Sequence, residues 1–237
     1  MQSSRSSLVI GAALIISTAI LGYFLQQSVE RFRSFERTIT VKGLSEHEVP
    51  ADTAIWPIQY SVISDDLGGL YQQLETQQQV VEQFLLENNF SEDEISASTP
   101  TINDKKAQNY GNYNANDIRF TATQTFTVYS EKIDAVLQAQ TRLLELGKRG
   151  LVLNGNSYEN RTQFLYSGLN QIKPKMIEDA TQKAREVAEK FAADSNSQLG
   201  KIKQARQGQF SISDRDSNTP YIKQVRVVST IEYYLID

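Results

Sequence analysis

The sequence predicts an α+β fold in which mixed or antiparallel sheets carry helices packed on one face, preceded by one N-terminal transmembrane helix. Three observations lead to this prediction. Several stretches alternate β-branched and aromatic residues, others place apolar residues at helical spacing, and 18 consecutive residues near the N-terminus carry no charge. After the apolar helix, the expected order of elements is ββαββαβαββ.

The uncharged stretch covers residues 8–25. At a rise of 1.5 Å per residue it would form a helix of about 27 Å, close to the hydrocarbon thickness of a bilayer. We expect an uncleaved membrane anchor rather than a signal peptide, because residues 26–28 offer no small-residue cleavage site. The expected organisation is a short tail (1–7), the anchor (8–25), a juxtamembrane linker (26–37) and one domain (38–237).

Charges beside the anchor leave its orientation open. Arg5 precedes the apolar stretch, whereas Arg31, Arg33 and Arg37 follow it. Counted alone, this distribution weakly favours a cytoplasmic C-terminal domain, because positively charged flanks tend to remain inside.

Stretches with a two-residue period predict the strands. Gly43 and residues 49–52 are expected to separate the first two strands, and Pro57 indicates an edge position or a bulge in the second. The expected strands cover residues 39–41, 53–63, 94–102, 118–129, 151–166, 199–210 and 221–236, with a polar turn at 211–220.

Apolar residues at steps of three and four predict helices over 67–89, 131–146 and from Lys173 onward. Gly147 is expected to end the second helix, and Pro174 to occupy the first turn of the third. The expected buried stripe of the third helix comprises Ile177, Ala180, Ala184, Val187, Ala188 and Phe191.

Composition excludes several classes of function. The net charge is −4 with acidic and basic residues interspersed, so no basic stripe is present to bind nucleic acid. Cysteine is absent, which excludes disulfides, thiolate metal sites and cysteine nucleophiles. The roughly 200 residues after the linker suffice for a single domain or two fused halves.

Residues with catalytic or metal-binding chemistry are sparse. His47 is the only histidine, and we interpret it as an exposed residue at a strand end rather than a ligand. Three acidic clusters could supply calcium ligands or an acid/base pair, but solvation and helix capping explain them better. They are Asp65-Asp66, Glu92-Asp93-Glu94 and Asp214-Arg215-Asp216. We therefore expect no catalytic site, no cofactor and no metal.

A polar stretch at residues 103–116 is expected to form a long hairpin loop. Its tip combines Tyr110, Asn112, Tyr113 and Asn114, and these residue types give adaptable polar contacts. We take this tip as the candidate binding loop.

Two groups of residues together resemble the SIMPL-domain family. The first comprises Val41-Lys42-Gly43 with Pro50-Ala51-Asp52, and the second comprises an alanine-spaced helix leading to a Leu-Gly strand, namely Ala180, Ala184, Ala188, Leu199 and Gly200. The resemblance covers residues 38–237. This chain departs from the family pattern at Ser45, Ala51 and Asn196.

The resemblance implies a bacterial envelope protein linked to stress tolerance, with no catalytic residues to transfer. It favours an inner-membrane protein with one span and a periplasmic domain, and some members form ring-like or channel-like homo-oligomers. We therefore expect function through oligomeric assembly or binding of envelope components. Two alternatives are a carboxylate-dependent enzyme acting on a cell-wall or carbohydrate substrate, and a monomeric ligand-binding module.

Overall fold

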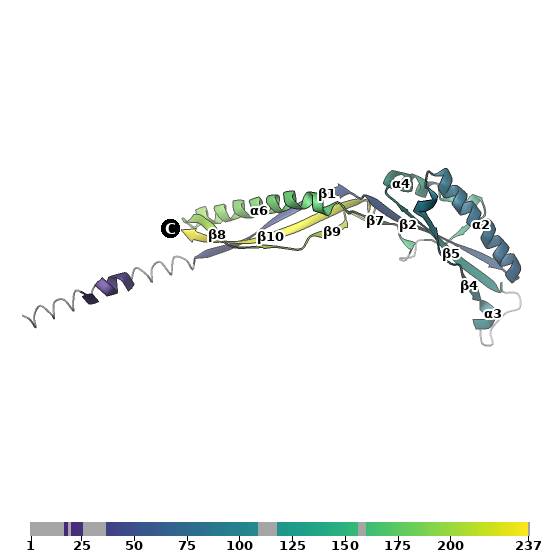
Figure 1. Ribbon diagram of the computed structural model, residues 1–237, viewed down its shortest axis with the longest axis horizontal. Helices are drawn as coiled ribbons and strands as arrows, with labels where there is room; N and C mark the ends of the chain where they lie inside the picture. The colour runs from purple at the N-terminus through teal and green to yellow at the C-terminus, as the bar shows by residue number, and fades with distance from the viewer. Residues whose placement is uncertain (1–16, 19, 26–36, 109–117, 156–159, 237) are drawn as a thin grey trace, which may run out of the picture. The chain divides into compact units, whose positions relative to one another are not determined.

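The computed structural model describes residues 17–18, 20–25, 37–108, 118–155 and 160–236, which divide into two compact units (Figure 1). The first unit contains the chain up to His47, residues 172–211 and the chain from Val225 onward. The second contains residues 48–171 and 212–224. The expected domain of residues 38–237 thus comprises both units.

The first unit is a sheet covered on one face by a long helix. Its strands run in the order β1 (Thr38–Pro50), β10 (Ile222–Ile236) and β8 (Gln198–Gln207), and β9 (Ser211–Asp214) also pairs with β10. Helix α6 (Leu169–Asp194) lies along this sheet (Figure 1). β9 lies where a polar turn was predicted.

Helix α6 approaches the sheet closely because small residues face each other. Its buried side chains recur every fourth residue and are Met176, Ala180, Ala184, Ala188 and Ala192. On β1, a Cβ built on Gly43 would lie 1.8 Å from the main-chain oxygen of Ala180. Only glycine fits at this contact.

The predicted buried stripe of this helix is wrong in its second half. Val187 and Phe191 are exposed, at 41% and 55%. A spacing of four residues drifts by about 40° per step, so the contact line winds around the helix, as the twist of a sheet requires. Pro174 is also misplaced by the prediction: the helix begins at Leu169, so this proline lies beyond the first turn.

The second unit is a six-stranded sheet with helices on one face. The strand order is β3 (Ile95–Ala97), β5 (Phe120–Ser130), β2 (Thr53–Ser64) and β6 (Val152–Leu153). β4 (Thr101–Asp104) pairs with β5, and β7 (Gln163–Leu165) pairs with β2. Helices α2 (Leu67–Glu87), α4 (Ile133–Thr141) and α5 (Leu144–Lys148) form the helical layer, whereas α3 (Lys105–Gln108) directly follows β4 (Figure 1).

Alternation along β5 and β2 builds the core of the second unit, as the sequence predicts for residues 118–129. Phe126 and Val128 are buried, as are Ile58 and Trp56 opposite them, and buried Tyr60 lies opposite Gln124. Tyr60 donates its phenolic hydrogen to the Gln124 side-chain oxygen at 2.6 Å, and burial raises the pKa of Tyr60 to about 12. This hydrogen bond satisfies both buried polar groups.

Several predicted elements are interrupted. The strand expected at 94–102 is a 3-10 turn (Glu92–Glu94) followed by β3 and β4, and the strand expected at 151–166 is only the short β6 and β7. The helix expected at 131–146 is split into α4 and α5, with Gly150 rather than Gly147 in the left-handed region (φ 93°). Conversely, β1 continues through Gly43, where a break was expected.

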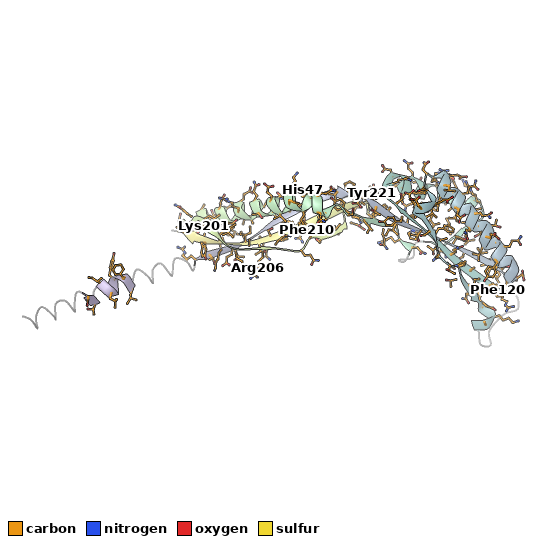
Figure 2. The ribbon with its side chains drawn as sticks, viewed as in Figure 1. His47, Phe120, Lys201, Arg206, Phe210 and Tyr221 are labelled. Atoms are coloured by element: carbon orange, nitrogen blue, oxygen red, sulfur yellow. The ribbon has the colours of Figure 1, made fainter. Side chains whose placement is uncertain are left out.

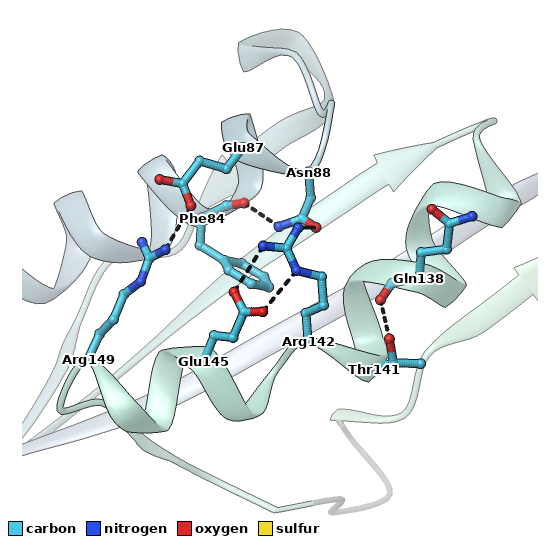
Figure 3. Close-up of polar contacts among 8 residues, drawn as sticks. All are labelled: Phe84, Glu87, Asn88, Gln138, Thr141, Arg142, Glu145 and Arg149. Carbon is cyan, nitrogen blue, oxygen red and sulfur yellow. Dashed lines mark hydrogen bonds and ion pairs between the residues drawn. The ribbon is translucent and has the colours of Figure 1, made fainter.

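A polar clamp joins the end of α2 to α5 (Figure 3). Arg142 donates to the Asn88 side-chain oxygen at 2.8 Å and to both oxygens of Glu145 at 3.0 Å. Asn88 in turn donates to the Phe84 carbonyl, and Arg149 donates to Glu87 at 2.8 Å. The clamp fixes the helices over the same sheet face.

The predicted membrane span lies mostly outside the described residues. Its described part, residues 17–18 and 20–25, is helical with every side chain exposed. Within the residues that the structure describes, no helix is long and apolar enough to cross a membrane. The anchor over residues 8–25 therefore stays a prediction.

Candidate functional site

The candidate binding loop, Tyr110, Asn112, Tyr113 and Asn114, lies outside the described residues. The structure places Pro50 and Asp52 at the junction between β1 and β2. Burial alone would raise the pKa of Asp52, but hydrogen bonds from the Ser167 main-chain nitrogen (2.6 Å) and hydroxyl (2.8 Å) lower it. Asp52 thus holds the segment after β7.

The outer side of β1 is one uncovered edge of the first unit. The sheet order places β1 at an end, and no strand among the described residues pairs with its outer side. From Thr38 to His47 this edge contains one lysine, Lys42, and no proline. Unpaired main-chain N–H and C=O groups along such an edge can pair with another chain.

Apolar side chains of α6 flank this edge. At 100° per residue, Val187 and Phe191 fall on the flank of the helix that carries Asp179 and Lys183. The Lys183 ammonium lowers the pKa of Asp179 most, and the Ser45 hydroxyl and His47 lower it further. Since Ser45 and His47 belong to β1, Asp179 faces this strand. Val187 and Phe191 therefore lie on the β1 side of the helix and remain exposed.

The opposite edge, β8, differs from β1 in its register and in its charge. Its register with β10 shifts between Glu232 and Tyr233 and again between Tyr233 and Leu235. Each shift places an extra residue on β8, and Gly200 lies in the second irregularity, close to the Tyr234 carbonyl. Bulges of this kind discourage pairing with a further strand.

Charge adds to the protection of β8. Lys201, Lys203 and Arg206 line this strand, and it carries no acidic residue (Figure 2). Leu199, from the family motif, packs against the small apolar core under α6. Lys203 is paired with Glu232, which leaves Lys201 and Arg206 as exposed cations on β8. Of the two edges, β1 is the one that can accept a partner strand without a penalty from bulges or from these two cations.

Several acidic residues of the described chain form ion pairs or cap helices. Glu94 accepts from Ser91, Ser130 and Lys132, Asp66 caps α2 through the Gly69 nitrogen, and Asp104 pairs with Arg119. Every carboxylate with a displaced pKa has it lowered, whereas a general acid needs it raised. These carboxylates are Asp52, Glu87, Glu94, Asp104, Glu145, Asp179, Asp216 and Glu232.

His47 is half-buried beside Asp179 and ends the β1 segment of the first unit. Within the described residues, no three His, Asp or Glu side chains lie together in a way that could hold a metal ion. The acids at Asp214 and Asp216 are likewise engaged, with Lys223 and Arg215 respectively.

Sequence reasoning missed a pocket of about 490 Å³ in the second unit. It lies at the edge of β2, between the points where β6 and β7 pair with that strand, and is lined by Trp56, Leu137, Leu143, Leu153 and Phe164 among the apolar residues. Its polar lining includes Gln59, Gln140, Asn154, Asn160 and Arg161. The volume suits a small ligand.

Pro57 was the available sequence signal for this pocket. The prediction of an edge position or a bulge is correct in part: β2 pairs fully with β5, but on its other side residues 56–58 have no strand partner among the described residues. Since the proline nitrogen cannot donate a hydrogen bond to a partner strand, β6 ends on one side of Pro57 and β7 begins on the other.

Comparison with known proteins identifies one family. A family model described as "SIMPL: Protein of unknown function (DUF541)" matches residues 39–230, which span parts of both units. No curated protein matches the chain.

Proposed function

Because this chain belongs to the SIMPL family, we propose that it is an envelope protein that functions by assembly of identical copies. In this proposal residues 8–25 anchor it in the bacterial inner membrane, and residues 38–237 lie in the periplasm, where the assembly binds envelope components during stress. The described part of the proposed anchor is helical, and Leu21 and Phe24 in it are more than half exposed, which supports burial in a membrane or against protein.

The observation that carries the proposal is the uncovered β1 edge beside Val187 and Phe191. Two copies related by a twofold axis would pair β1 with β1 in antiparallel register, because an isologous contact presents the same surface from both partners. The exposed faces of Val187 and Phe191 would then pack across the new contact. Burying the exposed apolar surface of these two side chains would stabilise the contact by about 25 cal/mol per Å².

The size of the contact sets its strength. Ten residues of β1, from Thr38 to His47, give about 33 Å of edge at 3.3 Å per residue. One edge and one helix flank bury on the order of 1,000 Å², the lower limit for a specific interface. Anchoring both copies in one membrane raises their effective concentration and favours the pairing.

A paired substitution tests this function. Phe191→Glu places a charge on the proposed contact, whereas Ile202→Glu places one on an equally exposed apolar residue of β8. We expect the full chain, purified in a mild detergent, to dissociate with Phe191→Glu and to keep its mass with Ile202→Glu. Equal behaviour of both variants in sedimentation would contradict the β1 contact.

A further inference from the structure

In the pocket beside β2, the Pro57 main-chain carbonyl accepts no hydrogen bond from the described residues, and several side chains still have hydrogen-bonding capacity. The Gln59 main-chain carbonyl accepts a hydrogen bond from the Asn154 main-chain nitrogen at 2.9 Å on this side of the strand. Main-chain groups of a strand alternate sides with a period of two, so the Pro57 carbonyl points to the same side, toward the pocket. An N–H donor placed there would fill the gap in the hydrogen-bond ladder between β6 and β7.

The amides around this carbonyl are ordered by one another. Gln59 Oε1 accepts from both Asn154 Nδ2 and Asn160 Nδ2 at 2.9 Å, and Gln59 Nε2 donates to Thr125. Gln140 donates to the Thr162 hydroxyl at 2.7 Å. Within the part of the chain that the structure describes, Asn160 Oδ1 and Gln140 Oε1 have no hydrogen-bond partner, so both remain available to a ligand.

Apolar and charged groups complete the site. Leu137, Leu143 and Leu153 are half-buried on the pocket wall, where an apolar side chain could cover them. Arg161 is exposed at the rim and forms no ion pair among the described residues, whereas Asp214, also on the rim, is paired with Lys223. Among the described residues that line this pocket, the unpaired charge is therefore positive.

We propose that this pocket binds a short extended peptide that carries an apolar side chain and a carboxylate. The peptide N–H donates to the Pro57 carbonyl, its side chain packs on the three leucines, and its carboxylate pairs with Arg161. This combination of main-chain pairing, an apolar pocket and a charge matches peptide recognition by strand addition. A glycan fits less well, because, of the aromatic rings that line the pocket, Trp56 and Phe164 are almost fully buried and only Tyr221 is half-buried.

The test uses the full chain in detergent with N-acetyl-Ala-Leu-Ala as the probe. Trp56 is the only tryptophan in the chain and lines the pocket, so its fluorescence reports occupancy alongside calorimetric heat. We expect saturable binding of the free acid, and about two- to fivefold weaker binding of the same peptide amidated at its C-terminus, since an exposed charge pair contributes little to affinity.

Matched variants separate the site from the rest of the surface. Arg161→Gln should remove the preference for the acid over the amide, while Arg206→Gln, an exposed arginine in the other unit, should leave it unchanged. Leu143→Phe should fill the pocket and abolish binding of both forms. Absence of heat and of any fluorescence change at about 5 mM peptide, where even millimolar affinity would register, overturns the proposal.

The same titration with a trimer of N-acetylglucosamine tests whether the pocket binds a glycan instead. Saturable binding of the sugar, abolished by Leu143→Phe, with no response to the peptide would replace the peptide with a glycan and contradict our assignment. Peptide binding tests the pocket separately from the β1 contact, because the pocket lies in the second unit and Phe191 in the first. Phe191→Glu should therefore leave peptide binding unchanged.

Discussion

At the scale of single residues, Gly43 determines how closely α6 can approach the sheet. Its missing side chain leaves the space that the Ala180 carbonyl occupies, and no rotamer change could relieve a clash with a main-chain atom. This contact explains why a glycine stands in the middle of a strand, where it would otherwise weaken the strand.

We expect Gly43→Ala to destabilise the protein by about 3 kcal/mol, because β1 and α6 must separate to admit the methyl group. Gly147→Ala is the control: nothing lies within 4 Å of its added Cβ and it lies inside α5, so stability should be unchanged or rise by about 0.5–1 kcal/mol. Urea denaturation of both variants measures the difference. Equal midpoints would refute the close-contact argument.

Glu94 is the residue whose ionisation affects stability most clearly. Burial raises its pKa, but hydrogen bonds from Lys132, Ser130 and Ser91 outweigh burial and lower the pKa of Glu94 to about 2, from 4.5. A carboxyl group with a lowered pKa in the folded state stabilises the protein at pH values above its pKa in the unfolded state. That stabilisation is complete above about pH 4.5 and is lost as the pH falls toward 2.

Glu94→Gln should therefore lower stability at neutral pH by about 1–2 kcal/mol, since solvent screens the half-exposed Lys132. The loss should shrink as the pH falls from 4.5 toward 2, because the wild-type carboxylate becomes protonated. Thermal unfolding across this range, with the exposed neighbour Glu92→Gln as control, tests the sign. A constant difference at every pH would exclude ionisation of Glu94 as the cause.

At the scale of elements, the clamp in Figure 3 holds the helical layer of the second unit. Arg142 joins the C-terminal end of α2 to α5 through Asn88 and Glu145, so its loss leaves the Asn88 side-chain oxygen without that donor. Removing one partner of a partly buried hydrogen bond costs more than the net energy of the bond.

We expect Arg142→Ala to lower the denaturation midpoint measurably, because the Asn88 side-chain oxygen loses its donor. Arg185→Ala removes an exposed i,i+4 pair with Glu189 on α6 and should leave the midpoint nearly unchanged. Chemical denaturation distinguishes the two. If Arg185→Ala proved the more damaging substitution, the clamp would have no structural role.

Periodic elements could be predicted from the sequence, but interruptions could not. The alternation over Phe120–Ser130 and the spacing over Leu67–Glu87 depend on local pattern alone. By contrast, the strand expected at 151–166 parts around the edge of β2 at Pro57, which is nearly 100 residues away in sequence. The signal for this interruption, Pro57, lies on the partner strand, so nothing within residues 151–166 indicates it.

The candidate site shows the same limit. Glycine and alanine positions such as Gly43 and Ala184 were visible as a pattern, but the exposure of Phe191 depends on how the contact line winds over a twisted sheet. The amides of the pocket come from β2 and from a segment 95 residues later, linked by the Gln59–Asn154 hydrogen bond. Neither stretch carries a recognisable motif by itself.

At the scale of the whole molecule, the proposed function depends on contacts between copies rather than on reactive groups. The β8 edge carries bulges and cations, while β1 remains open beside exposed apolar side chains. This asymmetry predicts one defined contact between copies and not indiscriminate pairing at both edges.

The most direct test is the absolute mass of the fragment 38–237, measured by light scattering after size exclusion over a range of concentrations. Our account predicts a discrete species at least twice the monomer mass, reduced to the monomer by Phe191→Glu and unaffected by Ile202→Glu. A monomer mass that does not change with concentration would contradict assembly through this region.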